Sequence, residues 1–122
     1  MDLIHKSDEE IMEVVTPIMD NLMEASTEID YDKHLLNHTE RAKKTLTREQ
    51  LEDMCKSYQA KFGIFTDREL MGIARHHNYI NVVWKQKMSK TEDEFLAILC
   101  LVQEGERYLV DRCWVDLWQP QS

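Results

Sequence analysis

The chain has 122 residues, of which 43% are hydrophobic and 31% charged, a mixture typical of a soluble globular domain. Its 15 basic and 23 acidic residues give a net charge of −8, which repels phosphate backbones and anionic lipid headgroups. We therefore expect neither nucleic acid nor a membrane as a partner. A chain of this length fits one domain spanning residues 1–122.

The opening residues lack the basic start and the apolar run of a secretory signal, which predicts a cytoplasmic location. The three cysteines, Cys55, Cys100 and Cys113, are odd in number and lie in apolar stretches, so they are expected to be free buried thiols. Neither a cofactor nor a metal is expected. No phosphate loop, dinucleotide fingerprint or zinc cluster occurs at its diagnostic spacing.

A long helix is predicted at the start of the chain. Ser7 and Glu10 form a capping box, in which each side chain satisfies an unpaired amide of the first turn. An apolar stripe at helical spacing follows and continues to about Met23. Pro17 lies inside this pattern and is expected to bend the helix.

A short second helix is predicted after an N-cap at Asp30 or Asp32, and it extends through Leu36 before a polar stretch over 37–44. His34 and His38 are four residues apart on this helix, a spacing that places two imidazoles on one face, as in some zinc sites. The segment holds no further ligand at zinc spacing. Ordinary exposed histidines are therefore the favoured interpretation.

A third helix is predicted over 48–62. Thr47 and Gln50 form a second capping box, and apolar residues follow at helical spacing. Gly63 stands where a helix closes in the left-handed conformation, which glycine adopts without steric cost.

The hydrophobic period changes to two after Asp67, which indicates strands. Four strands are expected, over 69–75, 79–88, 94–103 and 107–117, joined by short polar turns into an antiparallel meander. The turn at His76 and His77 is expected to be solvated. The third strand is apolar on both faces, so its outer face is expected to be covered by a helix or by another subunit.

Helices that precede a meander, together with Tyr108 and Val110 two apart after the turn Glu104-Gly105, resemble the nuclear transport factor 2-like superfamily. The resemblance implies an α+β fold in which three N-terminal helices pack on a curved four-stranded sheet. The two layers then form a cone with an apolar pocket, and the outer face of the sheet joins two copies in a homodimer. The superfamily includes isomerases, dehydratases, epoxide hydrolases, transport adaptors and domains without an activity. No catalytic motif of these enzymes matches this sequence.

Asp111 and Arg112 interrupt an apolar strand, and burying a charge is costly unless it is paired or faces a cavity. One of them is expected to face inward. Arg112 could bind an anionic or carbonyl oxygen while a tyrosine donates a hydrogen bond, or it could form a structural ion pair with a helix carboxylate. The candidate pocket residues are Tyr58, Trp84, Cys100, Tyr108, Arg112 and Trp114.

The aromatic residues Trp84, Trp114 and Trp118 could hold a flat ligand, although aromatic residues at strand spacing usually fill a core or an interface. Trp118 indicates a dimer contact near the end of the chain. Cys100 lacks a histidine that could act as its base, so an inert thiol is favoured.

The sequence leaves three functions open. The favoured one is a non-catalytic domain that binds a small, partly apolar molecule or serves as a dimeric scaffold. The second is a metal-free enzyme that performs isomerisation, dehydration or hydrolysis. The third is a protein interaction module with a filled pocket and an exposed apolar sheet face.

Overall fold

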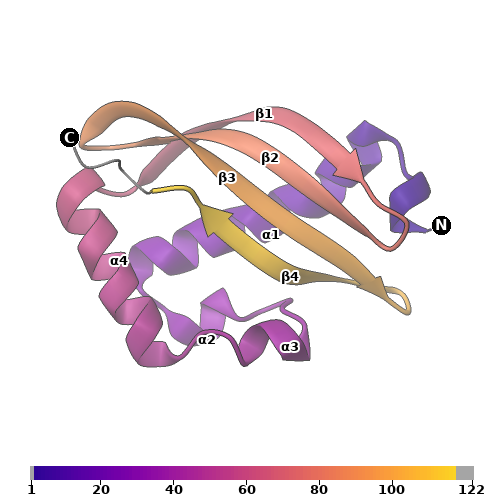
Figure 1. Cartoon of the computed structure of the whole chain (residues 1–122), viewed down its shortest axis with the longest axis horizontal. Coiled ribbons are helices and arrows are strands. Elements are labelled where there is room, and N and C mark those ends of the chain that lie inside the picture. The colour runs from indigo at the N-terminus through magenta and orange to yellow at the C-terminus, as the bar shows by residue number, and fades with distance from the viewer. Residues whose placement is uncertain (1, 118–122) are drawn as a thin grey trace.

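The computed structural model describes residues 2–117. A 3-10 turn, η1 (Leu3–His5), precedes the helices, which are α1 (Asp8–Glu28), α2 (Tyr31–His34), α3 (Glu40–Lys43) and α4 (Arg48–Phe62). The strands β1 (Phe65–Arg75), β2 (Tyr79–Met88), β3 (Thr91–Glu104) and β4 (Arg107–Val115) follow them. They form an antiparallel meander in the order β1-β2-β3-β4 (Figure 1). The predicted α+β class is confirmed, and the sheet is not closed.

The capping box that begins α1 is present, with the amide of Glu10 donating to Ser7 Oγ and the amide of Ser7 donating to the Glu10 carboxylate. The helix continues beyond Met23 to Glu28 and ends where Ile29 adopts left-handed angles, φ 56° and ψ 50°. Pro17 lies within α1 on its exposed side. The bend at Pro17 stays a prediction.

The segment between α1 and α4 differs from the expectation of one short helix followed by a polar stretch. Asp30 caps α2 by accepting from the amide of Lys33, but this helix ends at His34 rather than at Leu36. The polar stretch then contains α3, which Thr39 caps. The described residues therefore have two short helices where one was expected, because Thr39 supplies a second N-cap within the polar stretch.

The helix α4 has the predicted bounds and the predicted capping box. Gly63 has a positive φ of 85°, as expected, but its ψ of −147° lies outside the left-handed helical region. A Cβ built at this position would lie 2.0 Å from Ser89 Oγ. Both observations require glycine here.

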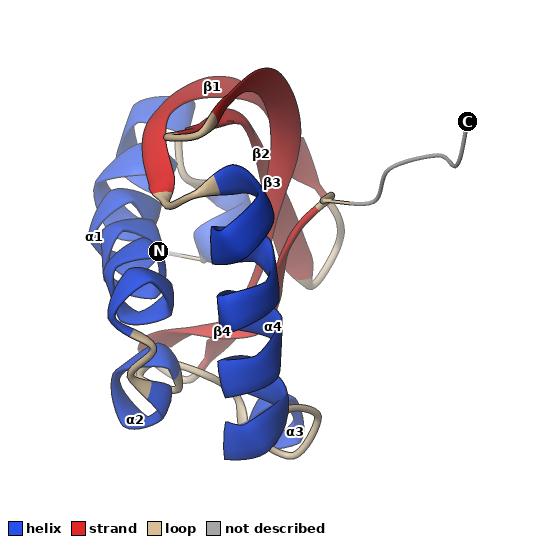
Figure 2. Ribbon diagram, turned by 90° about the vertical axis from the view of Figure 1, so that its left-hand side faces the viewer, coloured by secondary structure: helices blue, strands red, loops and turns tan. Residues whose placement is uncertain are grey.

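The core lies between α1 and the inner face of the sheet. Buried apolar residues of α1, such as Val15 and Met19, pack against Val82 and Trp84 of β2 and Leu99 of β3. Figure 2 shows α1 and α4 on one side of the sheet. A second cluster joins α4 to Met88 at the end of β2 and Phe95 in β3.

The strands begin and end at somewhat different residues from those predicted. Only β2 has the expected bounds; β1 and β3 begin earlier, and β4 ends at Val115 instead of Leu117. The β1 strand contains two register shifts, which obscure its alternation in the sequence. His76 and His77 are exposed in the turn between β1 and β2, as predicted.

The outer face of β3 is less covered than the sequence suggested. Leu96 is 44% exposed, whereas Ala97 and Leu99 on the inner face are fully buried. Within residues 2–117 the outer face is therefore not closed by a helix, and a second subunit on it stays a prediction. None of the helices in this range is long and apolar enough to cross a bilayer.

Candidate functional site

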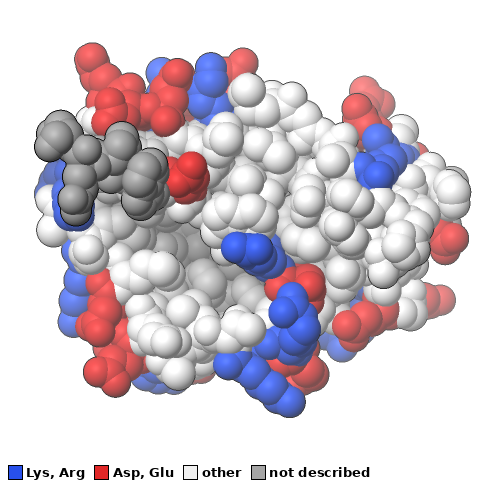
Figure 3. Space-filling model, viewed as in Figure 1, with Lys and Arg blue, Asp and Glu red and all other residues white. Residues whose placement is uncertain are grey.

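A cavity of about 130 Å³ opens between α1, α4 and β4. Its walls are mainly apolar and come from α1, α4, β1, β4 and the residues after β4, namely Leu22, Met23, Met54, Phe65, Cys113, Trp114, Val115 and Leu117. Three polar side chains, those of Ser26, His34 and Tyr58, complete the lining. Figure 3 shows the surface hollowed between α4 and β4, with mostly uncharged atoms around the hollow and acidic and basic side chains near its rim.

The Ser26 and Tyr58 hydroxyls hydrogen-bond to each other across α1 and α4, with 2.6 Å between their oxygens. Ser26 Oγ also lies 3.4 Å from Cys55 Sγ. Burial raises the pKa of the Tyr58 hydroxyl and the pKa of the Cys55 thiol, although the hydrogen bond from Ser26 opposes both changes. The Tyr58 hydroxyl and the Cys55 thiol are therefore neutral, and both have Ser26 Oγ as a hydrogen-bond partner.

His34 lies in the wall of this cavity, which corrects the expectation of ordinary exposed histidines. His34 is half-buried, and His38 is only 7% exposed. Their ring centroids are 5.4 Å apart. Burial, together with repulsion from His38, lowers the pKa of His34 to about 4. His34 Nδ1 is buried and has no hydrogen-bond partner among the described residues.

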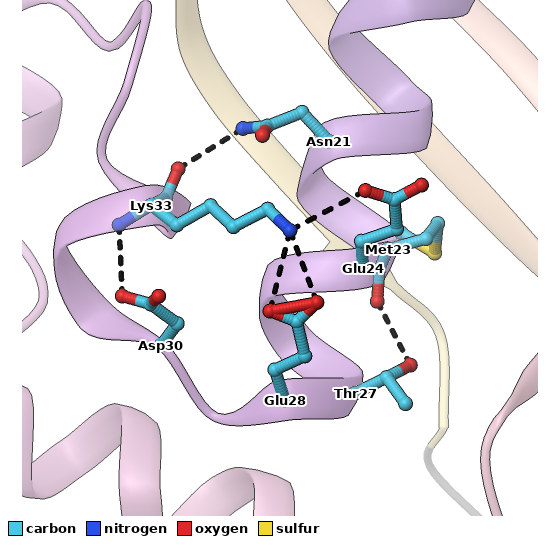
Figure 4. A network of polar contacts seen from close by, with 7 residues as sticks. All are labelled: Asn21, Met23, Glu24, Thr27, Glu28, Asp30 and Lys33. Atoms are coloured by element: carbon cyan, nitrogen blue, oxygen red, sulfur yellow. Dashed lines mark hydrogen bonds and ion pairs between the residues drawn. The ribbon is translucent and has the colours of Figure 1, made fainter.

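A set of polar contacts around Lys33 fixes α2, and with it His34, against α1 (Figure 4). Lys33 Nζ lies 3.3 Å from the Glu24 carboxylate and 3.1 Å from the Glu28 carboxylate. Asn21 Nδ2 donates to the carbonyl of Lys33 at 3.0 Å. Three residues of α1, Asn21, Glu24 and Glu28, therefore bind Lys33, the residue that precedes His34.

The structure brings two of the six candidate pocket residues, Tyr58 and Trp114, to the cavity. Trp84 is 2% exposed in the core under α1. Tyr108 is partly buried against the same core. Cys100 alternates with buried residues of β3 and is half-buried, and burial raises the pKa of its thiol.

Arg112, one of the two charged residues considered for an inward position, does not face inward, and the reason is a bulge in β4. Cys100 pairs with Arg112 and Leu101 pairs with Val110, so Asp111 is an extra residue in the strand. A bulge reverses the alternation beyond it. Arg112 is consequently exposed, with its guanidinium 4.1 Å from the centroid of the Trp114 ring.

The ion pair of this region is made by Asp111 instead of Arg112. Asp111 accepts a hydrogen bond from Thr39 Oγ1 at 2.9 Å and forms a salt bridge with Arg41 of α3. The hydrogen bond from Arg41 holds the pKa of the Asp111 carboxyl below its usual range. This pair fastens α3 to the edge strand and does not line the cavity.

Sequence reasoning missed Ser26 and His34, although each had a detectable pattern. Ser26 follows Leu22 by four residues and so continues the buried stripe of α1. His34 follows the half-buried Tyr31 by three residues, which places both on one face of α2. Cys113 could not be found in this way, because the bulge at Asp111 places its side chain on the face of β4 opposite to the one that simple alternation predicts.

A larger hollow of about 310 Å³ lies at the opposite end of the sheet, beside η1. Its walls include Asp2, Asn78 and Gln103, and it lacks an enclosing apolar surface. No group of three or more His, Cys, Asp or Glu side chains in residues 2–117 is arranged to hold a metal ion. The cavity beside Tyr58 is therefore the stronger candidate for a ligand site.

No protein-family model matches the sequence, and no curated protein matches it significantly. Solved structures do resemble the fold. A candidate aromatic ring hydroxylase of Novosphingobium aromaticivorans aligns with a TM-score of 0.53 and 13% identity, over 96% of this chain and 95% of that one. Protein Bd1075 of Bdellovibrio bacteriovorus aligns with a TM-score of 0.52 and 15% identity, over 94% of this chain.

These likenesses show a shared fold alone, because identities of 13% and 15% carry no information on chemistry. The chain spans 44% of the length of Bd1075. It spans nearly all of the Novosphingobium protein.

Proposed function

We propose that this chain is a nuclear transport factor 2-like domain that binds a small, partly apolar molecule in the cavity between α1, α4 and β4, without catalysing a reaction. The observation that carries the proposal is the lining of the cavity, which is apolar apart from Ser26, His34 and Tyr58. Small-molecule sites have this composition, with apolar walls and a few polar groups that fix orientation.

The titratable groups at the cavity favour binding over catalysis. A general acid or base works best when its pKa lies near the working pH. Here burial moves the pKa values away from neutrality, lowering that of His34 to about 4 and raising that of Cys113 to about 12. The pKa of Tyr58 is also raised.

The enzyme alternative keeps one specific observation in its favour. His34, whose neutral imidazole is a base, lines the same cavity as the Tyr58 hydroxyl. The exposed Arg112 does not join them to orient a carbonyl oxygen. Loss of a measured turnover in His34→Gln, with binding retained, would be required to support this alternative.

The proposal includes a homodimer in the cytoplasm, formed through the outer face of the sheet. The half-exposed Leu96 and the half-buried Ile98 on β3 support it, since exposed apolar side chains on a strand are removed from water when a second copy covers them. The three free cysteines fit a reducing compartment. Trp118, expected at the dimer contact, lies outside the described residues.

The test is binding of a small apolar probe, with the entrance of the cavity blocked in a variant. Met54 is 50% exposed and lines the cavity, so Met54→Trp fills the entrance without disturbing the core. Met71 is 56% exposed on β1, away from the cavity, and Met71→Trp is the matched control. Toluene should bind the wild type and Met71→Trp but not Met54→Trp. Equal binding by all three proteins would overturn the proposed site.

A further inference from the structure

We propose that the ligand is an uncharged single-ring molecule with one hydroxyl group, whose ring lies among the apolar walls and whose hydroxyl bonds to the His34 imidazole. This inference rests on the proposed binding function and specifies the chemistry of its ligand. Three properties of the cavity lead to it: its volume, the absence of charge in its lining, and the unmet hydrogen-bonding capacity of one side chain.

The volume limits the size of the ligand. An apolar cavity of about 150 Å³ in a protein core accepts benzene. The cavity between α1 and β4 has a volume of about 130 Å³. One six-membered ring therefore fills it, with Leu22 and Val115 among its apolar walls. A second fused ring would extend beyond these walls into solvent.

The lining limits the charge of the ligand. None of the residues that line the cavity carries a formal charge at neutral pH, because His34 is neutral there. Arg68, whose charge acts on Cys113, is already paired with Asp20. A buried charge without a partner is strongly disfavoured, so a carboxylate should be rejected.

The polar lining selects the functional group. Ser26 and Tyr58 already share a hydrogen bond of 2.6 Å, and Ser26 Oγ has a second partner in Cys55 Sγ at 3.4 Å. His34 differs, because its imidazole makes no side-chain hydrogen bond within residues 2–117. Its Nδ1 is shielded even from water, so Nε2 is the ring nitrogen that a ligand in the cavity can reach. A neutral imidazole offers one acceptor nitrogen and one N–H donor, and a hydroxyl group can pair with either. A ligand hydroxyl can therefore pair with the His34 imidazole in either tautomer.

The lysine contacts on α1 support a fixed position for this imidazole. Lys33, the residue before His34, is held by the carboxylates of Glu24 and Glu28 (Figure 4). Preorganised polar groups give orientation at a low entropic cost. The hydrogen bond at His34 should therefore discriminate between ligands of equal shape.

The experiment is an NMR titration of the full chain at pH 7, with the methyl groups of methionine as probes. Met23 and Met54 line the cavity, and Met71 lies on the exposed strand β1. The ligands are toluene, phenol, 2-naphthol, benzamide and benzoate. Toluene and phenol differ in the hydroxyl, 2-naphthol adds a ring, and benzamide and benzoate differ in charge. Dissociation constants of roughly 0.1 to 1 mM are expected for ligands with so few atoms.

The expected result has three parts. Phenol binds at least as tightly as toluene, 2-naphthol gains no affinity over phenol, and benzoate binds at least tenfold more weakly than benzamide. In His34→Leu the ratio of phenol to toluene affinity falls at least fivefold. This ratio is informative even if the substitution changes the stability of the fold.

The contrary results separate this inference from the proposed function. Equal binding of benzoate and benzamide, or an unchanged phenol to toluene ratio in His34→Leu, would overturn the ligand chemistry but leave the cavity a binding site. Tighter binding of 2-naphthol would overturn the size limit alone. If no ring compound shifts the methyl signals of Met23 and Met54, both the inference and the proposed function fail.

Discussion

The hydroxyl of Tyr58 lies 2.6 Å from Ser26 Oγ, and this contact joins α4 to α1 beside the cavity. Both side chains are buried, at 6% and 7% exposure. Because both hydroxyls are buried and bond to each other, the pair fixes the distance between the two helices. The width of the cavity depends on that distance.

We predict that Tyr58→Phe lowers the free energy of unfolding by about 1 kcal/mol, the typical contribution of one buried hydrogen bond. Urea denaturation measures the change. Ser26→Ala should cost less in the Tyr58→Phe background than in the wild type, since the two residues share the bond. Strictly additive losses would contradict the coupling.

The stability of the protein should fall as the pH is lowered from 6.5 toward 4, and part of this loss should come from His34. Its pKa is about 4 in the folded state and 6.5 in the unfolded state. In that window only the unfolded chain binds the proton, so acid favours unfolding, by on the order of 2 kcal/mol. Above pH 6.5 neither state is protonated and the contribution is fully present.

Urea denaturation of the wild type and of His34→Leu at several pH values tests this prediction. The variant should lose less stability between pH 6.5 and 4.5. His77→Gln, which removes an exposed histidine of the turn, is the control and should follow the wild type. Identical pH profiles for wild type and His34→Leu would show that burial does not depress the pKa of His34.

We predict that Gly63→Ala destabilises the protein by about 1 to 3 kcal/mol, because φ of 85° with ψ of −147° is strained for any residue with a Cβ. The new Cβ would also lie 2.0 Å from Ser89 Oγ. Gly105→Ala is the control, since its φ is 65° but no atom lies within 4 Å of the added Cβ. A larger loss in Gly105→Ala would contradict the packing argument.

Leu96→Lys should convert the proposed dimer to a monomer. Leu96 is 44% exposed on the outer face of β3, where an added charge would oppose an apolar interface. Leu70→Lys, at 41% exposure on β1 beside Met12 of α1, is the matched control. Sedimentation equilibrium measures the mass. A monomeric wild type would remove the homodimer from the proposal.

The sequence predicts the parts of this fold that local chemistry determines. The capping boxes at Ser7 and Thr47 fix where α1 and α4 begin, because their partners lie only three residues away. The alternation in β2 is likewise a local pattern, and its bounds were predicted correctly. The order of helices and strands follows from these elements.

The site could not be predicted to the same extent, because it depends on long-range pairing. The bulge at Asp111 is visible only in the register of β3 with β4, and it turns Arg112 outward. The burial of His34 depends on α2 packing against α1, which the left-handed turn at Ile29 permits. Tyr58 was found because it lies on the buried face of a regular helix.

The most direct test of the central claim is a crystal structure of the full chain soaked with phenol. The account predicts a ring bound between Leu22, Tyr58 and Trp114, with its hydroxyl within hydrogen-bond distance of the His34 imidazole. A cavity filled by the protein's own side chains, or phenol bound only elsewhere, would contradict the account.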